Sequence, residues 1–582
     1  MKASSFKEKK WFQKNWDNGA ADSISSELNI HPAIASILVQ RGLTNTAEAR
    51  SFLYPTLADL APPFLMKGMN EATALISDAI TNRIPFIIYG DYDVDGATGM
   101  AVLALFLRKV GVEVICCQPD RLIDGYGFHA NVIREIQSKA KKYVVITVDC
   151  GITDVDDVKE VKEMGYSVIV TDHHTPSSTL PPADAILNPL QPGCTFPFKF
   201  PAGVGVAFYL VMGLRNHLNK HDFWKGRAVP NLKALLDLVA VGTISDMVPL
   251  QSINRVLTKA GLEVLSTTDN LGLRSLMEIS GVNRLRISAE DISFRIGPRI
   301  NAAGRTGDPQ KAIELLTTDS ASRAKELAKE LDFQNNQRKL LEKEVYDAAF
   351  AIAKDQVLSG KCGLVLSGDG WHPGVIGIVA SRIMNQFNRP VILITVVDGL
   401  AKGSGRSTAG MNLLEVLTNC AELLEGFGGH KSAAGLSMLP EHIESFTKKF
   451  NSIVTEMISK EDLMPKLMID TRLNVDEILN KSFFDALYKL EPFGMGNPEP
   501  VFQSNNSWRI WKPRVVGTNH LKFFLKENGS ILNAIGFGFG HLVSNLETDP
   551  RAELAFNLRL NEFRGKTNRQ INLVDIRTAS TV

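Results

Sequence analysis

The chain has 582 residues, and at roughly 150 residues per domain this length predicts about four domains. Hydrophobic residues make up 44% of the chain and charged residues 22%, which excludes a disordered, collagen-like or coiled-coil protein. A net charge of +1 argues against a surface that is basic throughout, although it allows a local basic groove. We therefore expect a multi-domain globular protein.

The sequence contains no segment that predicts a membrane span or a secretory signal. Its longest apolar stretch, residues 201–213, is shorter than the roughly 20 residues that a bilayer requires. The lysine-containing start has neither an apolar core nor a small-residue cleavage site, so it does not resemble a signal peptide. Six cysteines without a CxxC spacing indicate reduced thiols rather than a disulfide scaffold. We expect a cytoplasmic protein with no membrane partner.

The first half of the chain predicts a small helical layer followed by an α/β domain. Residues 1–65 end in a proline-rich stretch and predict the helical layer, whose role cannot be inferred. From about residue 84, short β-branched runs alternate with amphipathic segments, as in IPFIIYG, VEVICC, YVVITVD and SVIVTD. Buried strands separated by helices of this length are typical of βαβ units in a parallel sheet. This α/β domain is expected over residues 66–265.

The second half predicts a helical connector, a smaller α/β domain and a barrel. In the connector, residues 266–356, a stretch from about residue 320 has apolar residues at three- and four-residue spacing and predicts one long helix. Strands and helices alternate again over residues 357–455. Residues 456–582 contain short strands separated by turns, which is typical of a small β-barrel. The predicted fold class is α/β, with two α/β domains joined by a long helix and a C-terminal barrel.

Acidic residues and histidines directly follow three of the predicted parallel strands. They are Asp91, Asp93 and Asp95 after the first, Asp149 after the second, and Asp172, His173 and His174 after the third. Asp246 follows the apolar segment LLDLVAVGTIS and is a further candidate. A single aspartate after a strand is most often a helix cap, but ligands bind at this edge of open parallel sheets.

Several carboxylates that converge on one edge need cations among them, because like charges repel. Mixed aspartate and histidine ligands are more typical of a Mn²⁺ site than of a Mg²⁺ site, whose ligands are all oxygen atoms. Two such ions about 4 Å apart would activate water and stabilise the leaving oxygen in phosphoester hydrolysis. Gly96 and Gly151, beside the clusters, allow tight turns and close approach of a phosphate.

The near-neutral total charge combines two regions of opposite sign. Residues 85–250 contain 15 Lys or Arg against 18 Asp or Glu, a net charge of −3. Residues 501–582 contain 11 Lys or Arg against 6 Asp or Glu, a net charge of +5. We expect the acidic region to hold cations and the basic region to attract phosphates.

Several ordered motifs resemble those of a known enzyme family. YGDYDVDGATG, TVDCG, TDHH and GTISDMVPL resemble the four motifs of the DHH phosphoesterase superfamily. FRIGPRINAAGR, GWHPGVIGIVASR, GSGRS and GFGGHKSAAG are similar to the RecJ branch with its DHH-associated domain. The resemblance covers nearly the whole chain from about residue 45. It implies DHH, DHH-associated and OB-fold domains, and a 5′→3′ exonuclease specific for single-stranded DNA.

The resemblance also implies two divalent cations, Mn²⁺ or Mg²⁺, and roles for the acidic and histidine residues. The implied metal ligands are Asp93, Asp95, Asp149, His173 and Asp246, with Asp149 as the bridge. Asp91 would support the metal shell, and Asp172 and His174 would orient the site, with His174 near the scissile phosphate. A ligating histidine usually donates its other ring N–H, and either Asp172 or a carbonyl could accept it from His173. For His174, the alternative is a core histidine with satisfied hydrogen bonds.

Exonuclease action from a 5′ end requires groups that bind a terminal phosphate, for which bidentate arginine is suited. The candidates that the resemblance places along the nucleic-acid path are Arg121, Arg299, Asn301, Arg305, Ser404 and Arg406. For each arginine, the alternative is an interdomain salt bridge. Gly429 and His430 lie in a segment that resembles a substrate-binding loop, where the backbone N–H groups of Gly428 and Gly429 could form an anion nest.

Aromatic and basic residues of the C-terminal strands fit an OB-fold that stacks bases and follows the nucleic-acid backbone. They are Trp508, Trp511, Lys512, Arg514, Phe523, Phe524 and Arg564. Strand alternation must bury one face, so about half of these aromatic residues are expected in the core. Trp371 is expected to pack rather than to stack on a base.

We expect hydrolysis by a metal-activated water and release of 5′-mononucleotides as the strand passes between the two α/β domains. The resemblance implies a monomer in DNA recombination and repair, with a helicase and a single-strand-binding protein as partners. One alternative is a DHH phosphodiesterase of short oligonucleotides or cyclic dinucleotides, against which the C-terminal barrel argues. Another is a catalytically dead replication scaffold, against which the complete motif set argues.

Overall fold

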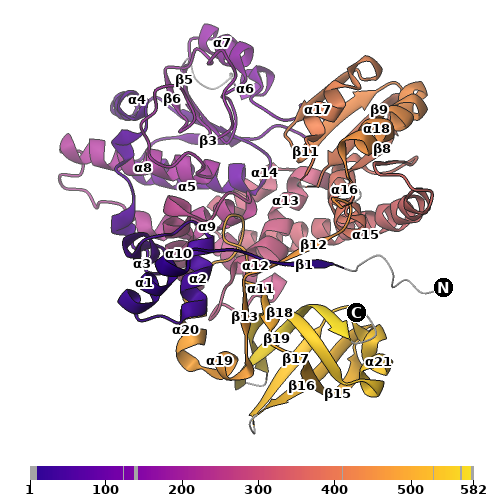
Figure 1. Cartoon of the computed structure of the whole chain (residues 1–582). Coiled ribbons are helices and arrows are strands. Elements are labelled where there is room, and N and C mark those ends of the chain that lie inside the picture. Colours follow the sequence, from indigo (N-terminus) through magenta and orange to yellow (C-terminus); the bar gives the residue numbers. More distant parts are fainter. Residues whose placement is uncertain are drawn as a thin grey trace. The chain divides into compact units, whose positions relative to one another are not determined.

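The computed structural model describes residues 9–121, 123–136, 142–408, 410–459, 461–527, 530–563 and 566–578 (Figure 1). It divides into two compact units. Unit 1 comprises residues 61–248 and 260–465, and unit 2 comprises residues 9–60, 249–259 and 466–582. None of the helices in the described ranges is long and apolar enough to cross a membrane.

Unit 1 begins with a five-stranded parallel sheet, as predicted. Its strands, in spatial order, are β3 (Val114–Cys117), β2 (Phe86–Gly90), β4 (Val144–Val148), β5 (Ser167–Thr171) and β6 (Ala185–Leu187). The associated helices are α4 (Met69–Thr81), α5 (Val94–Val110), α6 (Ala130–Ile136), α7 (Val155–Glu163), α8 (Gly203–Lys220) and α9 (Leu236–Ser245). Because β2, β4 and β5 are parallel neighbours, the residues that follow them lie side by side at one edge.

The helical connector ends in one long helix, which confirms the prediction from its periodicity. Helix α15 (Ala321–Leu358) has 38 residues and is capped by the Ser320 side chain, which accepts a hydrogen bond from the Arg323 N–H. The preceding helices are α11 (Leu271–Ser280), α12 (Ala289–Asp291), α13 (Gly297–Thr306) and α14 (Gln310–Thr317). Helix α13 packs against α15 and places the FRIGPRINAAGR segment beside it.

The second α/β domain of unit 1 has a mixed five-stranded sheet. In spatial order its strands are β10 (Gly426–Gly429), β11 (Ala433–Met438), β9 (Leu400–Arg406), β8 (Val391–Val397) and β7 (Leu364–Ser367). Its helices are α16 (Pro373–Phe387), α17 (Leu413–Thr418) and α18 (Ile443–Met457). The expectation of a glycine-rich loop is wrong in part, because Gly426–Gly429 pair with β11 as an edge strand and only the turn at His430 is irregular.

Unit 2 contains the predicted barrel, drawn in yellow in Figure 1. Its strands are β15 (Trp508–Val516), β16 (His520–Glu527), β17 (Ser530–Gly536), β18 (Arg551–Phe563) and β19 (Lys566–Thr578). The sheet closes because β18 pairs with both β15 and β19. Trp508 and Phe523 are buried and Trp511 is 39% exposed, which confirms the expected alternation. Arg564 lies outside the described residues.

The N-terminal layer shares one hydrophobic core with the barrel. It consists of β1 (Lys10–Gln13), α1 (Asn18–Leu28), α2 (Pro32–Gln40) and α3 (Thr46–Leu53). The other elements of unit 2 are the start of α10 (Ser252–Ser266), β12 (Lys466–Ile469), β13 (Thr471–Leu473), α19 (Val475–Leu479), α20 (Lys481–Lys489), β14 (Phe502–Ser504) and α21 (Val543–Thr548). Strand β1 pairs in parallel with β12, so residues near the start of the chain join the C-terminal segment of unit 2.

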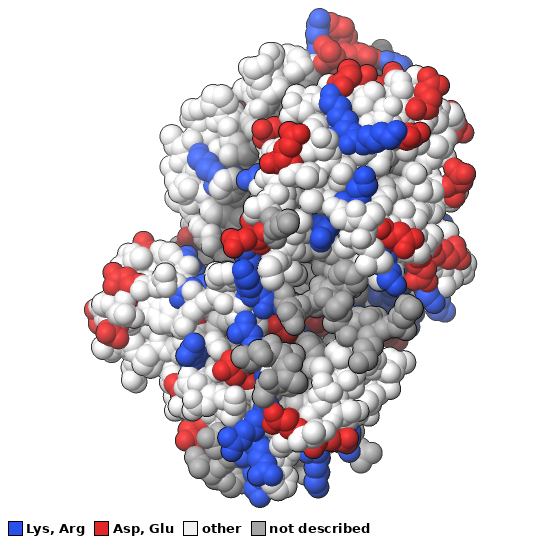
Figure 2. Space-filling model, turned by 45° about the vertical axis from the view of Figure 1, so that its right-hand side comes forward, with Lys and Arg blue, Asp and Glu red and all other residues white. Residues whose placement is uncertain are grey.

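The surface charge and the state of the cysteines agree with the predictions made from the composition. The face drawn in Figure 2 carries both basic and acidic side chains and is not basic throughout, as a net charge of +1 predicts. All six cysteines are free, and Cys117, Cys150 and Cys420 are buried. Trp371 is buried as predicted.

Candidate metal centre and adjoining cationic pocket

Eight acidic and histidine side chains gather at the carboxyl edge of the parallel sheet. Their ligand atoms form three overlapping groups, in each of which all atoms lie within 4.8 Å of one another. The groups are Asp91, Asp93 and Asp149; Asp149, His173 and His174; and Asp95, His173 and Asp246. Asp172 lies beside them and contacts His174. The structure thus brings together all the residues that the sequence predicted for a metal centre.

His173 lies at the centre of this arrangement. Its Nε2 is 2.9 Å from Asp149 Oδ1, 3.7 Å from Asp246 Oδ2 and 4.0 Å from Asp95 Oδ2. Adjacent ligands of an octahedral ion with bonds of about 2.1 Å lie about 3 Å apart, so these spacings suit side chains that share cations. Asp149 and His173 each belong to two of the three groups, and of the two the Asp149 carboxylate has the two oxygens that a bridging ligand needs.

Several buried polar atoms in the centre have no hydrogen-bond partner among the described residues. They are Asp91 Oδ1, Asp149 Oδ1, Asp246 Oδ2 and His173 Nε2. Burial raises the pKa of Asp149 and Asp246, and neighbouring carboxylates raise it further. Burial, helped by Asp93, also raises the pKa of Asp95 to about 7. Uncompensated buried carboxylates of this kind are stabilised by divalent cations, so the residues present fit two such ions.

The two neighbouring histidines have different partners, which the sequence left open. Asp172 Oδ1 lies 2.8 Å from His174 Nδ1 and also accepts the N–H groups of His173 and His174. These contacts lower the pKa of Asp172 although its burial opposes ionisation. The ring of His173 instead bonds the Pro201 carbonyl, and burial next to His174 lowers its pKa to about 4. A neutral His173 is the form that can bind a metal.

Backbone features around the centre allow its residues to approach closely. Asp149 has a left-handed backbone with φ of 64°, an uncommon conformation that points to a functional constraint. A Cβ at Gly203, the first residue of α8, would lie 2.8 Å from the Asp149 Cβ. A Cβ at Gly96 would lie 2.3 Å from the Asp91 carbonyl oxygen, so this glycine allows helix packing rather than phosphate approach. Gly151 does have a positive φ of 105°, as a tight turn requires.

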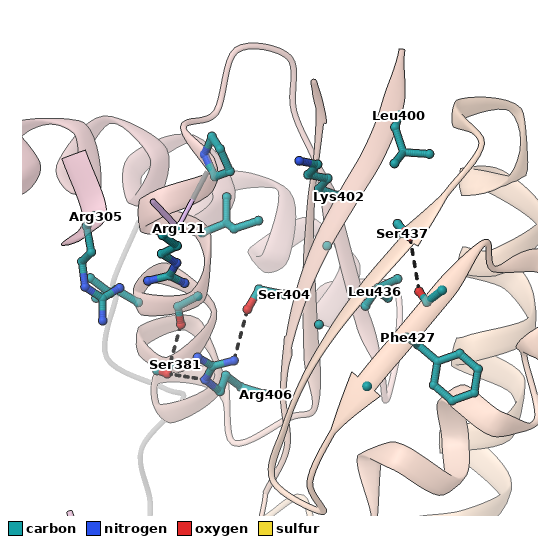
Figure 3. A pocket seen from close by; sticks show the side chains of 18 of the residues that line it. Arg121, Arg305, Ser381, Leu400, Lys402, Ser404, Arg406, Phe427, Leu436 and Ser437 are labelled. Atoms are coloured by element: carbon teal, nitrogen blue, oxygen red, sulfur yellow. Dashed lines mark hydrogen bonds between the residues drawn. The ribbon is translucent and has the colours of Figure 1, made fainter. Parts of the chain in front are cut away.

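A cationic pocket of about 830 Å³ adjoins the centre within unit 1. Four residues predicted to bind substrate line it, namely Arg121, Arg305, Ser404 and Arg406. Figure 3 shows Arg121 and Arg305 on one side and strand β9, which carries Lys402 and Ser404, on the other. The pKa of Arg305 is lowered to about 10, mainly by burial and by Arg121, whereas Asp93 of the metal centre opposes this shift. The Arg121 guanidinium lies 5.3 Å from the centroid of the Tyr92 ring, and Tyr92 stands between Asp91 and Asp93, so the pocket adjoins the metal centre.

Two of the pocket arginines, Arg305 and Arg406, are held by neutral groups. Arg406 donates to Ser381 Oγ at 3.1 Å and Ser404 Oγ at 3.1 Å (Figure 3). It also donates to the Gly405 carbonyl at 2.7 Å. Arg305 donates to the Gly374 carbonyl. In the part of the chain that the structure describes, neither arginine forms an ion pair with a carboxylate. Their charges are available to an anion.

Four other predicted substrate residues lie elsewhere. Arg299 forms an ion pair with Asp332 of α15, 2.7 Å from Nη2 to Oδ1, so the alternative of a salt bridge applies to it. Asn301 accepts the Val94 N–H at 3.2 Å and lies next to the metal centre rather than in the pocket. Gly429 and His430 form the end of an exposed hairpin, and the pocket is lined instead by Gly426, Phe427 and Gly428 of the same strand.

Sequence reasoning missed several residues that contact the site. The Tyr126 hydroxyl lies 3.1 Å from His174 Nδ1, and the Gln118 side chain donates to the Asp91 carbonyl. The Asn188 amide donates to the His174 carbonyl. Arg382 lines the pocket and donates to Glu342 of α15. Tyr126 lies five residues after Arg121 in the segment PDRLIDGYG, and this closeness to a predicted substrate-binding residue was the signal that could have identified it.

Comparison with family models covers most of the chain. Residues 85–243 match the N-terminal domain of the DHH family, and residues 356–456 match the DHHA1 domain. Residues 469–575 match the RecJ OB domain. These matches agree with the domain types predicted from the motifs.

Relatives match over nearly the full length. The single-stranded-DNA-specific exonuclease RecJ of Bacillus subtilis is 37% identical over 570 residues, which cover 97% of this chain and 70% of the relative. The protein of the same name from Haemophilus influenzae is 37% identical over 95% of this chain and 97% of its own length. The crystal structure of Thermus thermophilus RecJ in complex with Mn²⁺ superposes with a TM-score of 0.81 and 32% identity, covering 98% of this chain and 79% of that one. The chain belongs to the RecJ family of single-stranded-DNA-specific exonucleases.

Proposed function

We propose that this protein is a metal-dependent exonuclease that degrades single-stranded DNA from its 5′ end and releases 5′-mononucleotides. The observation that carries the proposal is the adjacency of the metal centre to a pocket in which Arg305 and Arg406 lack carboxylate partners among the described residues. Family membership supports the substrate, because the relatives are named single-stranded-DNA-specific exonucleases.

The proposed ligands of two divalent cations, Mn²⁺ or Mg²⁺, are Asp93, Asp95, Asp149, His173 and Asp246. The solved Thermus thermophilus relatives with Mn²⁺ and with Mg²⁺ support this choice of ions. When bound, such ions lower the pKa of water and stabilise the charge on a leaving oxygen. Asp91 would support the metal ligands rather than bind metal directly, since it is buried next to Asp93.

Asp172 orients His174 in the proposed mechanism. An ionised Asp172 can only accept hydrogen bonds, so the proton on the imidazole lies on Nδ1 and Nε2 is left for the substrate or its water. His174 is the more exposed of the two histidines, with 35% of its side chain accessible against 11% for His173. It would therefore contact the scissile phosphate while His173 holds metal.

Arg121, Arg305, Ser404 and Arg406 would bind the terminal 5′-phosphate. The Arg406 guanidinium donates hydrogen bonds to two serine hydroxyls, which are neutral, so its charge is available to a phosphate oxygen.

The exposed face of the barrel, with Trp511, Lys512 and Arg514, would bind single-stranded DNA by stacking and charge. A helicase and a single-strand-binding protein would supply the strand to a monomeric enzyme in repair and recombination.

The proposal is tested with one oligonucleotide prepared with the label at its 5′ or its 3′ end. With Mn²⁺, we expect the 5′ label to leave first as a mononucleotide and the same strand in a blunt duplex to persist. Arg406→Gln should raise KM for a 5′-phosphorylated strand about tenfold, the effect of losing one charge-assisted hydrogen bond. Arg323→Gln is the control, because Arg323 lies outside the pocket and is ion-paired with Glu314. Release of the 3′ label first, or activity confined to dinucleotides, would contradict the proposal.

A further inference from the structure

Tyr126 contacts the one imidazole of the centre that the metal-binding proposal does not use. Its hydroxyl lies 3.1 Å from His174 Nδ1 and 3.4 Å from Nε2, and it also reaches the Asp149 carbonyl at 3.4 Å. The two rings meet edge to face with centroids 5.6 Å apart. The imidazole is thereby held between a carboxylate, Asp172, and a phenol.

The backbone around Tyr126 is built to present this side chain. Gly125 and Gly127, on either side of it, have positive φ values of 88° and 114°, which other residues rarely adopt. The Gly127 carbonyl accepts a hydrogen bond from the Tyr89 hydroxyl at 3.0 Å. The next residue, Phe128, donates its N–H to Asp154 at 2.7 Å. Both the direction of the chain and its position are therefore fixed at Tyr126.

Packing does not account for this arrangement, since Tyr126 is 48% exposed. Only its hydroxyl end reaches into the centre. Burial of this end, together with Asp172 and Asp149, raises the pKa of Tyr126, so the hydroxyl stays protonated and donates to the Asp149 carbonyl, while its oxygen can accept from the His174 Nδ1–H. A phenylalanine would provide the same ring without this contact.

We propose that Tyr126 is a positioning residue for the hydrolytic reaction, which holds the His174 imidazole against Asp172 so that Nε2 faces the substrate. This inference rests on the proposed function. Because Tyr126 acts through His174, its removal lowers turnover without weakening the binding of DNA. Its effect also depends on the presence of the His174 imidazole.

The test compares Tyr126→Phe, His174→Ala and the double variant on a 5′-phosphorylated single strand with saturating Mn²⁺. Tyr126→Phe is expected to lower kcat about tenfold, as the loss of one hydrogen bond does, with KM and melting temperature unchanged. In the His174→Ala background the same substitution should have no further effect. Tyr166→Phe is the control, because Tyr166 precedes β5 and lies at the opposite edge of the sheet.

An unchanged kcat in Tyr126→Phe would overturn the inference. So would a tenfold loss that persists in the His174→Ala background, or a rise in KM at constant kcat, which would make Tyr126 a DNA-binding residue instead. Failure of the proposed function is distinguishable, because the wild-type protein would then not degrade the single strand at all.

Discussion

Asp95 combines a role in folding with a place in the metal centre. Its carboxylate is fully buried, and its two oxygens accept the N–H groups of Gly203 at 2.6 Å and Val204 at 2.9 Å, which caps α8. The same carboxylate faces His173 at 4.0 Å. Charge on Asp95 is therefore costly when no cation is bound and favourable when one is.

This balance predicts a pH-dependent stabilisation by metal. Burial raises the pKa of Asp95 to about 7, whereas an aspartate in the unfolded chain ionises near pH 4. Between these values the metal-free folded protein binds more protons than the unfolded chain, so its free energy of unfolding falls as pH rises from about 4 to about 7. We expect Mn²⁺ to raise the melting temperature, relative to EDTA, more at pH 7.5 than at pH 5. A gain that is largest at pH 5 would contradict this expectation.

The convergence of the acidic residues could be predicted from sequence because parallel strands place their carboxyl ends at one edge. The partners of individual side chains could not. Asp172 bonds His174 while His173 turns to the Pro201 carbonyl, a choice that depends on a residue 28 positions along the chain. The ion pair between Arg299 and Asp332 could not be predicted either, because it depends on how α13 packs on α15.

Helix α8 approaches the metal centre through a glycine at its first residue. A Cβ at Gly203 would meet the Asp149 side chain at 2.8 to 3.0 Å, closer than side chains normally pack. The next glycine of this helix, Gly205, is also buried, but a Cβ there would lie 3.5 Å from Pro201, an ordinary contact. Gly203 and Gly205 are therefore a matched pair of positions in α8 at which alanine substitutions can be compared.

Gly203→Ala is therefore expected to displace Asp149, lower kcat about a hundredfold and weaken Mn²⁺ binding, as misplacement of a reacting group by about 1 Å does. It should also cost about 1–3 kcal/mol of stability through overpacking. Gly205→Ala should change neither quantity appreciably. Activity and thermal melts of both variants measure these effects, and equal behaviour of the two would contradict the role given to Gly203.

Strand and helix types were predictable where hydrophobic periodicity was regular, as in α15 and in β2, β4 and β5. The hairpin of β10 and β11 was not, because glycine in a strand carries no apolar side chain from which to read the alternation. The sequence therefore indicated a glycine-rich loop around Gly429 and His430, where the structure has an edge strand that ends at Gly429.

Unit 2 is assembled from three separate segments, and a buried arginine joins them. Arg255 donates from Nε to the Phe52 carbonyl at 2.7 Å and from its terminal nitrogens to the carbonyls of Lys489, Leu490 and Glu491. Its guanidinium also lies 3.7 Å from the centroid of the Phe52 ring. Sequence reasoning predicted a separate N-terminal layer because contacts across 200 residues leave no local pattern.

Arg255→Lys should destabilise unit 2 by about 2 kcal/mol or more, because an ammonium cannot satisfy four carbonyls fixed around a planar guanidinium. Chemical denaturation should show a lower midpoint, and Arg227→Lys, at an exposed position of unit 1, should leave the midpoint unchanged. A midpoint for Arg255→Lys equal to that of the wild type would show that the carbonyls are satisfied in another way.

For the whole molecule, the central claim is that the carboxylates and histidines of unit 1 form a dinuclear centre that hydrolyses single-stranded DNA. The most direct measurement is a calorimetric Mn²⁺ titration of the wild type and Asp149→Asn, paired with nucleotide release by the same samples. We predict two Mn²⁺ per wild-type chain, fewer in Asp149→Asn, and nucleotide release only from the wild type. Full activity of Asp149→Asn, or of wild-type protein in excess EDTA, would contradict the account.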